Sequence, residues 1–165
     1  LGFFFIPKCI KSPDGYSWGG SGVLCTTLDL AKFAYVFMKN GKVNGEQLIS
    51  EQFVKEAISQ QIETDTYGYG GNTRLSMGYG YQIWRIGNNG FGFCGMGNQH
   101  AFCYPDKDLM IVCTADNQGK PEDTTRVLMD SMNKNIVHKC LDNPVPENEK
   151  TKMHLAENIF VSKKK

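Results

Sequence analysis

The stretch Gly92–Phe102 constrains the fold more than any other part of the sequence. It holds three glycines within six residues, and strand-like apolar residues lie on both sides of it. A glycine cluster between two strand signals marks backbone that a side chain would obstruct. Two interpretations follow. The segment is either the tight turn of a plain hairpin, or an edge strand whose bare backbone N–H groups face a ligand.

Strand signals surround this stretch, at Tyr79–Ile86, at about His100–Tyr104 and at Leu109–Thr114. The turns between them, at residues 87–90 and 105–108, are short and rich in Gly, Asn, Pro and Asp. Strands joined by short turns pair antiparallel. The third strand is a continuous apolar run, so we expect other elements to cover both of its faces.

Helical signals flank the strands. Thr26 and Asp29 match a capping box, in which a hydroxyl and a carboxylate each bind an N–H of the first turn. Apolar residues at helical spacing predict three helices, which run from Thr27 to a stop at Asn40-Gly41, from the N-cap Ser50 through about Gln60, and from near Pro121 to near His138. We expect residues 61–78 to form a loop. The fold class is therefore α/β of the α+β type, an antiparallel sheet flanked by helices.

Length and composition indicate one globular domain. The chain has 165 residues, of which 41% are hydrophobic and 21% charged. We assign residues 1–140 to this domain and residues 141–165 to a charged linker or tail. A net charge of +1 gives no reason to expect a nucleic-acid partner, and no apolar run is long enough to span a membrane. The apolar start, Leu1–Ile6, does not have the form of a signal peptide, and we expect the chain to be a piece of a longer protein.

The six cysteines are widely spaced, with no C-x-x-C pair. His138 and Cys140 lie close together, but two ligands do not make a metal site, so we predict neither a metal nor another cofactor. Cys94, Cys103 and Cys113 each lie in an apolar run and are predicted to be buried free thiols. Free thiols favour a reducing compartment.

Several strings of residues, in the same order, resemble segments of one protein family. They are Gly19–Leu24 with Thr26–Phe33, Asn40–Gly45 with Leu48–Glu51, Tyr79–Trp84, Gly95–Gln99, and Pro105–Val112. The family is the β-lactamase-related serine hydrolases, which includes class C β-lactamases, D-alanyl-D-alanine carboxypeptidases, esterases and amide hydrolases. The resemblance runs from about residue 12 to 139. It implies the C-terminal portion of a β-lactamase/penicillin-binding-protein-like transpeptidase fold.

The resemblance also implies a chemistry. These enzymes transfer acyl groups through an S-x-x-K serine, helped by a Y-x-N tyrosine and by a third motif on a sheet-edge strand. Here the third motif falls on Gly95-Met96-Gly97-Asn98-Gln99. The backbone N–H of Met96 is then the expected oxyanion-hole donor, and its four neighbours in the motif are expected to contact the substrate. A structural role within the strand remains open for Asn98 and Gln99.

Two residues near the N-terminus join the predicted substrate site through the same resemblance. Ser21 corresponds in position to a residue that faces the pocket in class C enzymes, and Trp18 is expected at its rim. From the sequence alone, the same segment also fits a surface loop pinned by one aromatic residue.

The chain departs from the family pattern at the nucleophile. Ser131–Lys134 and Ser162–Lys165 match S-x-x-K as letters, but both follow the third motif instead of preceding it. No Y-x-N occurs, since Tyr69–Asn72 is one residue too long. The resemblance therefore implies that the nucleophile and the general base belong to a missing N-terminal half of the same domain. This chain alone is expected to be inactive.

Two functions are compatible with these observations. One is a fragment of a bacterial serine hydrolase acting on an amide, ester or β-lactam, with a small-molecule or peptide substrate bound in the complete domain. The other is a non-catalytic binding or interaction domain, favoured by Met96 where relatives carry a polar or basic side chain. Relatives are common in the cell envelope, whereas the thiols favour the cytoplasm. An isolated piece of this domain is expected to be poorly stable unless its missing half or an oligomer covers the exposed sheet edge.

Overall fold

The computed structural model describes residues 7–64, 77–120, 123–140 and 150. Most of the loop predicted at 61–78 and, apart from Lys150, the whole tail predicted at 141–165 lie outside the described residues. Within the described residues, no helix has the length and apolar character needed to cross a bilayer.

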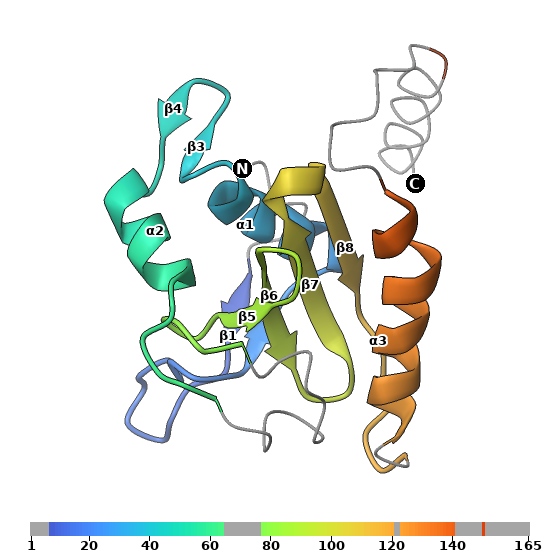
Figure 1. Ribbon diagram of the computed structural model, residues 1–165. Coiled ribbons are helices and arrows are strands. Elements are labelled where there is room, and N and C mark those ends of the chain that lie inside the picture. The colour runs from blue at the N-terminus through green and yellow to red at the C-terminus, as the bar shows by residue number, and fades with distance from the viewer. Residues whose placement is uncertain (1–6, 65–76, 121–122, 141–149, 151–165) are drawn as a thin grey trace.

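An antiparallel sheet of four strands forms the centre of the molecule (Figure 1). Its strands are β5 (Trp84–Ile86), β6 (Gly90–Gly95), β7 (Gln99–Tyr104) and β8 (Leu109–Cys113), and each pairs with the next along the chain. Two further pairs of two-residue strands lie outside this sheet: β1 (Lys8–Cys9) with β2 (Val23–Leu24), and β3 (Lys42–Val43) with β4 (Glu46–Gln47). The predicted class, an antiparallel sheet flanked by helices, is confirmed.

The strand predicted at Tyr79–Ile86 is shorter in the structure. Only its last three residues form β5. A tight turn occupies the part before it, because Gln82 adopts a left-handed φ of 59° and the N–H of Gly80 donates to the carbonyl of Ile83 at 2.8 Å. The neighbouring backbone groups bond to segments other than the sheet, since the N–H of Tyr79 donates to the carbonyl of Ile62 and that of Tyr81 to the carbonyl of Ala57.

Three α-helices of the described residues flank the sheet. They are α1 (Thr27–Met38), α2 (Glu51–Ile58) and α3 (Asp123–Asn135), and short 3-10 helices occupy Pro105–Lys107 and Val137–Lys139. The N-caps are those predicted: the Thr26 hydroxyl accepts the N–H of Asp29, and the Ser50 hydroxyl accepts that of Phe53. Helix α2 ends before Gln60 because Ser59 is extended, and its hydroxyl donates to a carbonyl of the last turn.

The strand β8 has partners on both faces, as its continuous apolar run predicted. Side chains alternate between the faces of a sheet. Met110 and Val112 pack against the core shared with α1, whereas Leu109, Ile111 and Cys113 pack against the core shared with α3. Burying one such side chain fully contributes about 1.5–3 kcal/mol. The sheet therefore separates two apolar cores.

Candidate active site

The glycine-rich stretch forms a hairpin tip. Gly95 and Gln99 are the last paired residues of β6 and β7, and Met96, Gly97 and Asn98 connect them. Gly97 and Asn98 have φ angles of 77° and 68°. Glycine adopts this left-handed region without steric cost, and asparagine is among the few side chains enriched there. These three residues are called the hairpin tip below.

Next to the tip, the strand has an open side. β5 pairs with β6 only as far as Gly92, so in the described part of the chain Phe93–Gly95 are paired with β7 alone. The stretch is therefore a turn at the hairpin tip and, beside it, a strand that within the described residues is paired on one side; that its N–H groups face a ligand stays a prediction. The side chain of Met96 is 72% exposed.

A buried hydrogen bond fixes one side of the hairpin tip. Nε2 of His100 donates to Oδ1 of Asn98 over 3.1 Å, and both side chains are almost completely buried. The thiol of Cys113 on β8 donates to the carbonyl of Asn98 over 3.3 Å. These contacts hold a left-handed residue, which is otherwise strained, in a single conformation.

Gln99 fixes the other side. Its side-chain Nε2 donates to the carbonyls of Gly97 and Ala115. The N–H of Asn117 also donates to the carbonyl of Gly97, over 3.4 Å. The hairpin tip is thereby tied to the segment that continues β8. These bonds give Asn98 and Gln99 structural roles, and their contact with a substrate stays a prediction.

His100 is a residue that the sequence analysis missed as part of this site. Its strand position places it beside Cys94 on β6 and Cys113 on β8. Burial lowers the pKa of His100 to about 4 and raises that of Cys94 to about 12. This row of three neighbouring side chains, Cys94, His100 and Cys113, is therefore neutral at pH 7. Among the described residues no group of three potential ligands can hold a metal ion. The available sequence signal was a histidine within an apolar strand, two residues after an asparagine.

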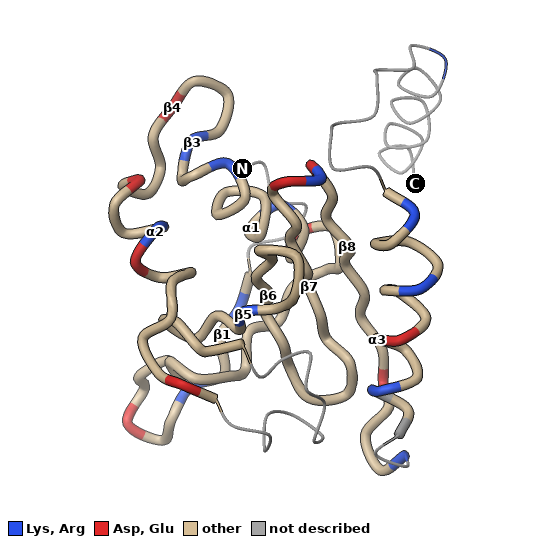
Figure 2. Tube along the Cα trace, in the orientation of Figure 1, with Lys and Arg blue, Asp and Glu red and all other residues tan. Residues whose placement is uncertain are grey.

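The two strands that carry the hairpin tip hold no charged residue, although Asp116 lies between Ala115 and Asn117, which bond the tip from the segment after β8. Residues 90–104 contain no Asp, Glu, Lys or Arg, and the tube along β6 and β7 is uncharged throughout (Figure 2). The hairpin itself therefore offers backbone dipoles and no charged side chains. Backbone N–H groups that are fixed before the reaction can stabilise a developing negative charge without reorganising.

Trp18 and Ser21 lie in the segment between β1 and β2, and both are exposed. The N–H of Trp18 donates to the carbonyl of Ile10 over 3.1 Å, which closes this segment on itself. Figure 1 shows the segment and the hairpin tip at the same end of the molecule. The hydrogen bonds described above do not join them, so their shared pocket stays a prediction.

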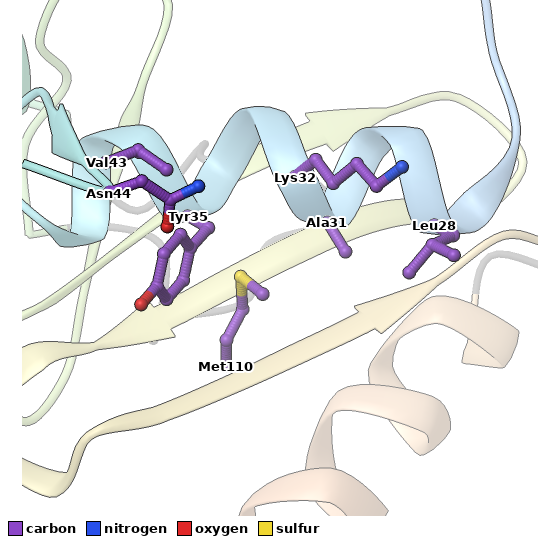
Figure 3. Close-up of a pocket in the computed structure, with 7 residues that line it drawn as sticks. All are labelled: Leu28, Ala31, Lys32, Tyr35, Val43, Asn44 and Met110. Atoms are coloured by element: carbon purple, nitrogen blue, oxygen red, sulfur yellow. The ribbon is translucent and has the colours of Figure 1, made fainter. Parts of the chain in front are cut away.

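Two hollows on the described surface lie away from the hairpin tip. One, of about 470 Å³, is lined mainly by α1 together with Met110 (Figure 3). The other, of about 180 Å³, lies between α3 and the turn after β5. Neither includes a residue of the predicted substrate site.

The same fold occurs in solved structures. A protein assigned as a 6-aminohexanoate-dimer hydrolase, from Bacillus anthracis, matches 79% of this chain with a TM-score of 0.59 and 18% identity. A protein assigned as a β-lactamase, from Bacteroides dorei DSM 17855, matches 75% with a TM-score of 0.52 and 16% identity. This chain therefore has the β-lactamase-related fold, as its sequence predicted.

This chain covers less than half of either solved structure. The chain spans 33% of the Bacillus anthracis protein and 44% of the Bacteroides dorei protein. No protein-family model matches the chain, and no curated protein matches its sequence.

Proposed function

We propose that this chain is part of a serine hydrolase, in which it forms the oxyanion side of the active site. The observation that carries the proposal is the hairpin tip beside an open strand edge. As far as the structure describes the chain, Phe93–Gly95 are paired on one side only, and Met96 follows them directly at an exposed position. An amide, ester or β-lactam carbonyl placed there is within reach of the Met96 N–H.

The chemistry follows from what acyl transfer requires. Attack on a carbonyl places negative charge on its oxygen, and a fixed N–H about 3 Å from that oxygen lowers the barrier. The side chains of His100, Gln99 and Cys113 hold the hairpin tip in place. The nucleophilic serine and its base are supplied by the N-terminal half of the same domain, which is the partner that this chain requires. Trp18 and Ser21 form the rim.

A fluorophosphonate probe, which labels activated serines, tests whether the nucleophilic serine lies outside this chain. We expect no labelling of the 165-residue chain and strong labelling of a protein extended upstream in the same reading frame. Labelling of the 165-residue chain alone would refute the proposal, because the nucleophile would then lie within it.

The role of Met96 is tested in the extended protein. Met96→Pro removes the N–H, and we expect hydrolysis to fall by about 10²–10³-fold, as for other oxyanion donors. Met96→Leu keeps the N–H and a similar volume, and is the matched control with near-normal activity. Equal activity of the two variants would exclude the Met96 N–H from the oxyanion hole.

A non-catalytic binding domain is the second candidate. It is favoured by the side chain of Met96, which is apolar and 72% exposed where catalytic relatives carry polar or basic groups. An exposed apolar side chain at a pocket rim suits binding better than charge stabilisation. Probe labelling of the extended protein at its S-x-x-K serine would exclude this candidate.

A further inference from the structure

The three residues of the hairpin tip lie beyond the hydrogen-bond ladder of the sheet. That ladder ends where Gly95 pairs with Gln99. Gly97 and Asn98, with consecutive left-handed φ angles of 77° and 68°, then turn the chain directly after Met96. The ladder therefore fixes where the turn begins and ends, whereas the conformation of the turn depends on the contacts that its own residues make.

Asn98 is the buried residue of the three. Its side chain is 2% exposed, although asparagine is mostly an exposed residue type. Burying an amide is unfavourable unless a hydrogen bond replaces the one lost to water. Nε2 of His100 supplies such a bond to Oδ1 over 3.1 Å, whereas the thiol of Cys113, a weaker donor, binds the carbonyl. The imidazole donor therefore allows Asn98 to keep its side chain inside the protein.

The imidazole of His100 can hold Asn98 because the ring is itself held. It is completely buried on β7 and stacks on the ring of Phe102, with centroids 5.0 Å apart and planes 17° apart. Among the described residues its other nitrogen, Nδ1, has no hydrogen-bond partner, so no second polar contact within that part of the chain competes with Asn98. A ring fixed by stacking directs its N–H along one line, as a group that orients another residue must.

We propose that His100 is a positioning residue for acyl transfer, which acts on the Met96 N–H through Asn98. The proposal rests on the function proposed above, in which that N–H binds the developing oxyanion. The side chain of Met96 is 72% exposed, so its packing does little to orient the peptide group. The turn that follows orients this group instead, and Asn98 keeps the turn in place while His100 satisfies its buried oxygen.

Loss of the imidazole donor leaves a buried amide oxygen without this partner. Because such an oxygen is unfavourable, the side chain of Asn98 moves toward water and the turn changes with it. A displacement of about 1 Å at a catalytic group lowers the rate by about 10²-fold. An oxyanion donor acts in the transition state, so the loss falls on kcat and leaves KM nearly unchanged.

Steady-state hydrolysis by the protein extended upstream tests this role. His100→Phe keeps a stacking ring without a donor, and we expect kcat to fall by about 10²-fold while KM stays within about twofold. His100→Gln returns a side-chain N–H near the position of Nε2 and is expected to recover most of kcat. Gly45→Ala, in the turn between β3 and β4 at the other end of the molecule (Figure 1), is the control for lost stability and is expected to keep the wild-type kcat.

The outcomes separate this proposal from the function on which it rests. If Met96→Pro lowers kcat but His100→Phe does not, His100 has no positioning role and the proposed function stands. A His100→Gln variant as slow as His100→Phe, or a loss confined to KM, also overturns the proposal. If Met96→Pro and Met96→Leu are equally active, the proposed function fails, and the positioning of that N–H is overturned with it.

Amide nitrogen relaxation in the 165-residue chain tests the positioning without hydrolysis. The Met96 N–H is expected to be rigid in the wild-type chain, with an order parameter of about 0.85, and to fall below about 0.6 in His100→Phe. His100→Gln is expected to stay near the wild-type value. A Met96 N–H that is equally rigid in the wild-type and His100→Phe chains would overturn the positioning role, even where the Met96 variants support the proposed function.

Discussion

The buried imidazole of His100 makes the stability of the protein depend on pH. Its side chain is completely buried, and in the described structure its Nδ1 has no hydrogen-bond partner. Burial lowers its pKa from 6.5 to about 4. Between these two values the unfolded chain binds a proton that the folded chain excludes. Stability is therefore greatest above pH 6.5 and is lost as the pH falls toward 4.

The size of this effect follows from the two pKa values. At pH 5, excluding the proton costs the folded state about 2 kcal/mol, and at pH 4 the loss is about 3 kcal/mol. The nearest side chains in the row, Cys94 and Cys113, are neutral thiols whose pKa values are raised by burial, so neither offsets the proton. The loss is a large fraction of the stability of an ordinary domain.

Urea unfolding at pH 7 and pH 5, followed by tryptophan fluorescence, measures this loss. His100→Gln keeps a side-chain donor toward Asn98 but cannot take up the proton, so we expect its stability at pH 5 to be about 2 kcal/mol closer to its value at pH 7. His138→Gln, which changes an exposed histidine, is the control and keeps the wild-type pH dependence. A wild-type chain and a His100→Gln variant with the same pH dependence would refute the reasoning.

Three further predictions concern single positions. Gly41 and Gly45 both have left-handed φ angles, but a Cβ at Gly41 would lie 2.0 Å from a backbone oxygen, whereas the space at Gly45 is open; in urea unfolding Gly45→Ala should cost about 1 kcal/mol and Gly41→Ala clearly more, and equal losses would contradict this. Thr26→Ala removes the N-cap of α1 and should lower the free energy of unfolding by about 1 kcal/mol; an unchanged urea midpoint would show that the cap is not needed. Burial raises the pKa values of Cys94 and Cys103 to about 12, so at pH 8 mass spectrometry should find both unmodified by iodoacetamide until urea is added, while rapid labelling without urea would contradict their burial.

The fold could be predicted from the sequence because the signals that begin and end its helices and strands are local. The capping residues Thr26 and Ser50 and the short turns between β6, β7 and β8 each act within a few residues. The order of the predicted helices and strands then matched the β-lactamase-related fold. The strand β5 was predicted too long, because the left-handed Gln82 is not a residue type that marks a turn.

The site was only partly predictable for a different reason. The glycines showed where a turn must lie, but several contacts that fix it come from β8 and the segment after it. Cys113 on β8 donates to the carbonyl of Asn98, and Gln99 donates to the carbonyl of Ala115. Such contacts depend on register, which the sequence alone does not specify for a glycine-rich strand.

The order of the strands has a consequence for how the chain folds. Every strand of the main sheet pairs with its neighbour in the sequence, so these contacts close short loops and form quickly. The contact between Thr27 and Thr114 instead joins residues 87 positions apart. Closing so long a loop carries a larger entropic cost. We therefore expect the β-meander to form first and the docking of α1 onto it to limit the rate of folding.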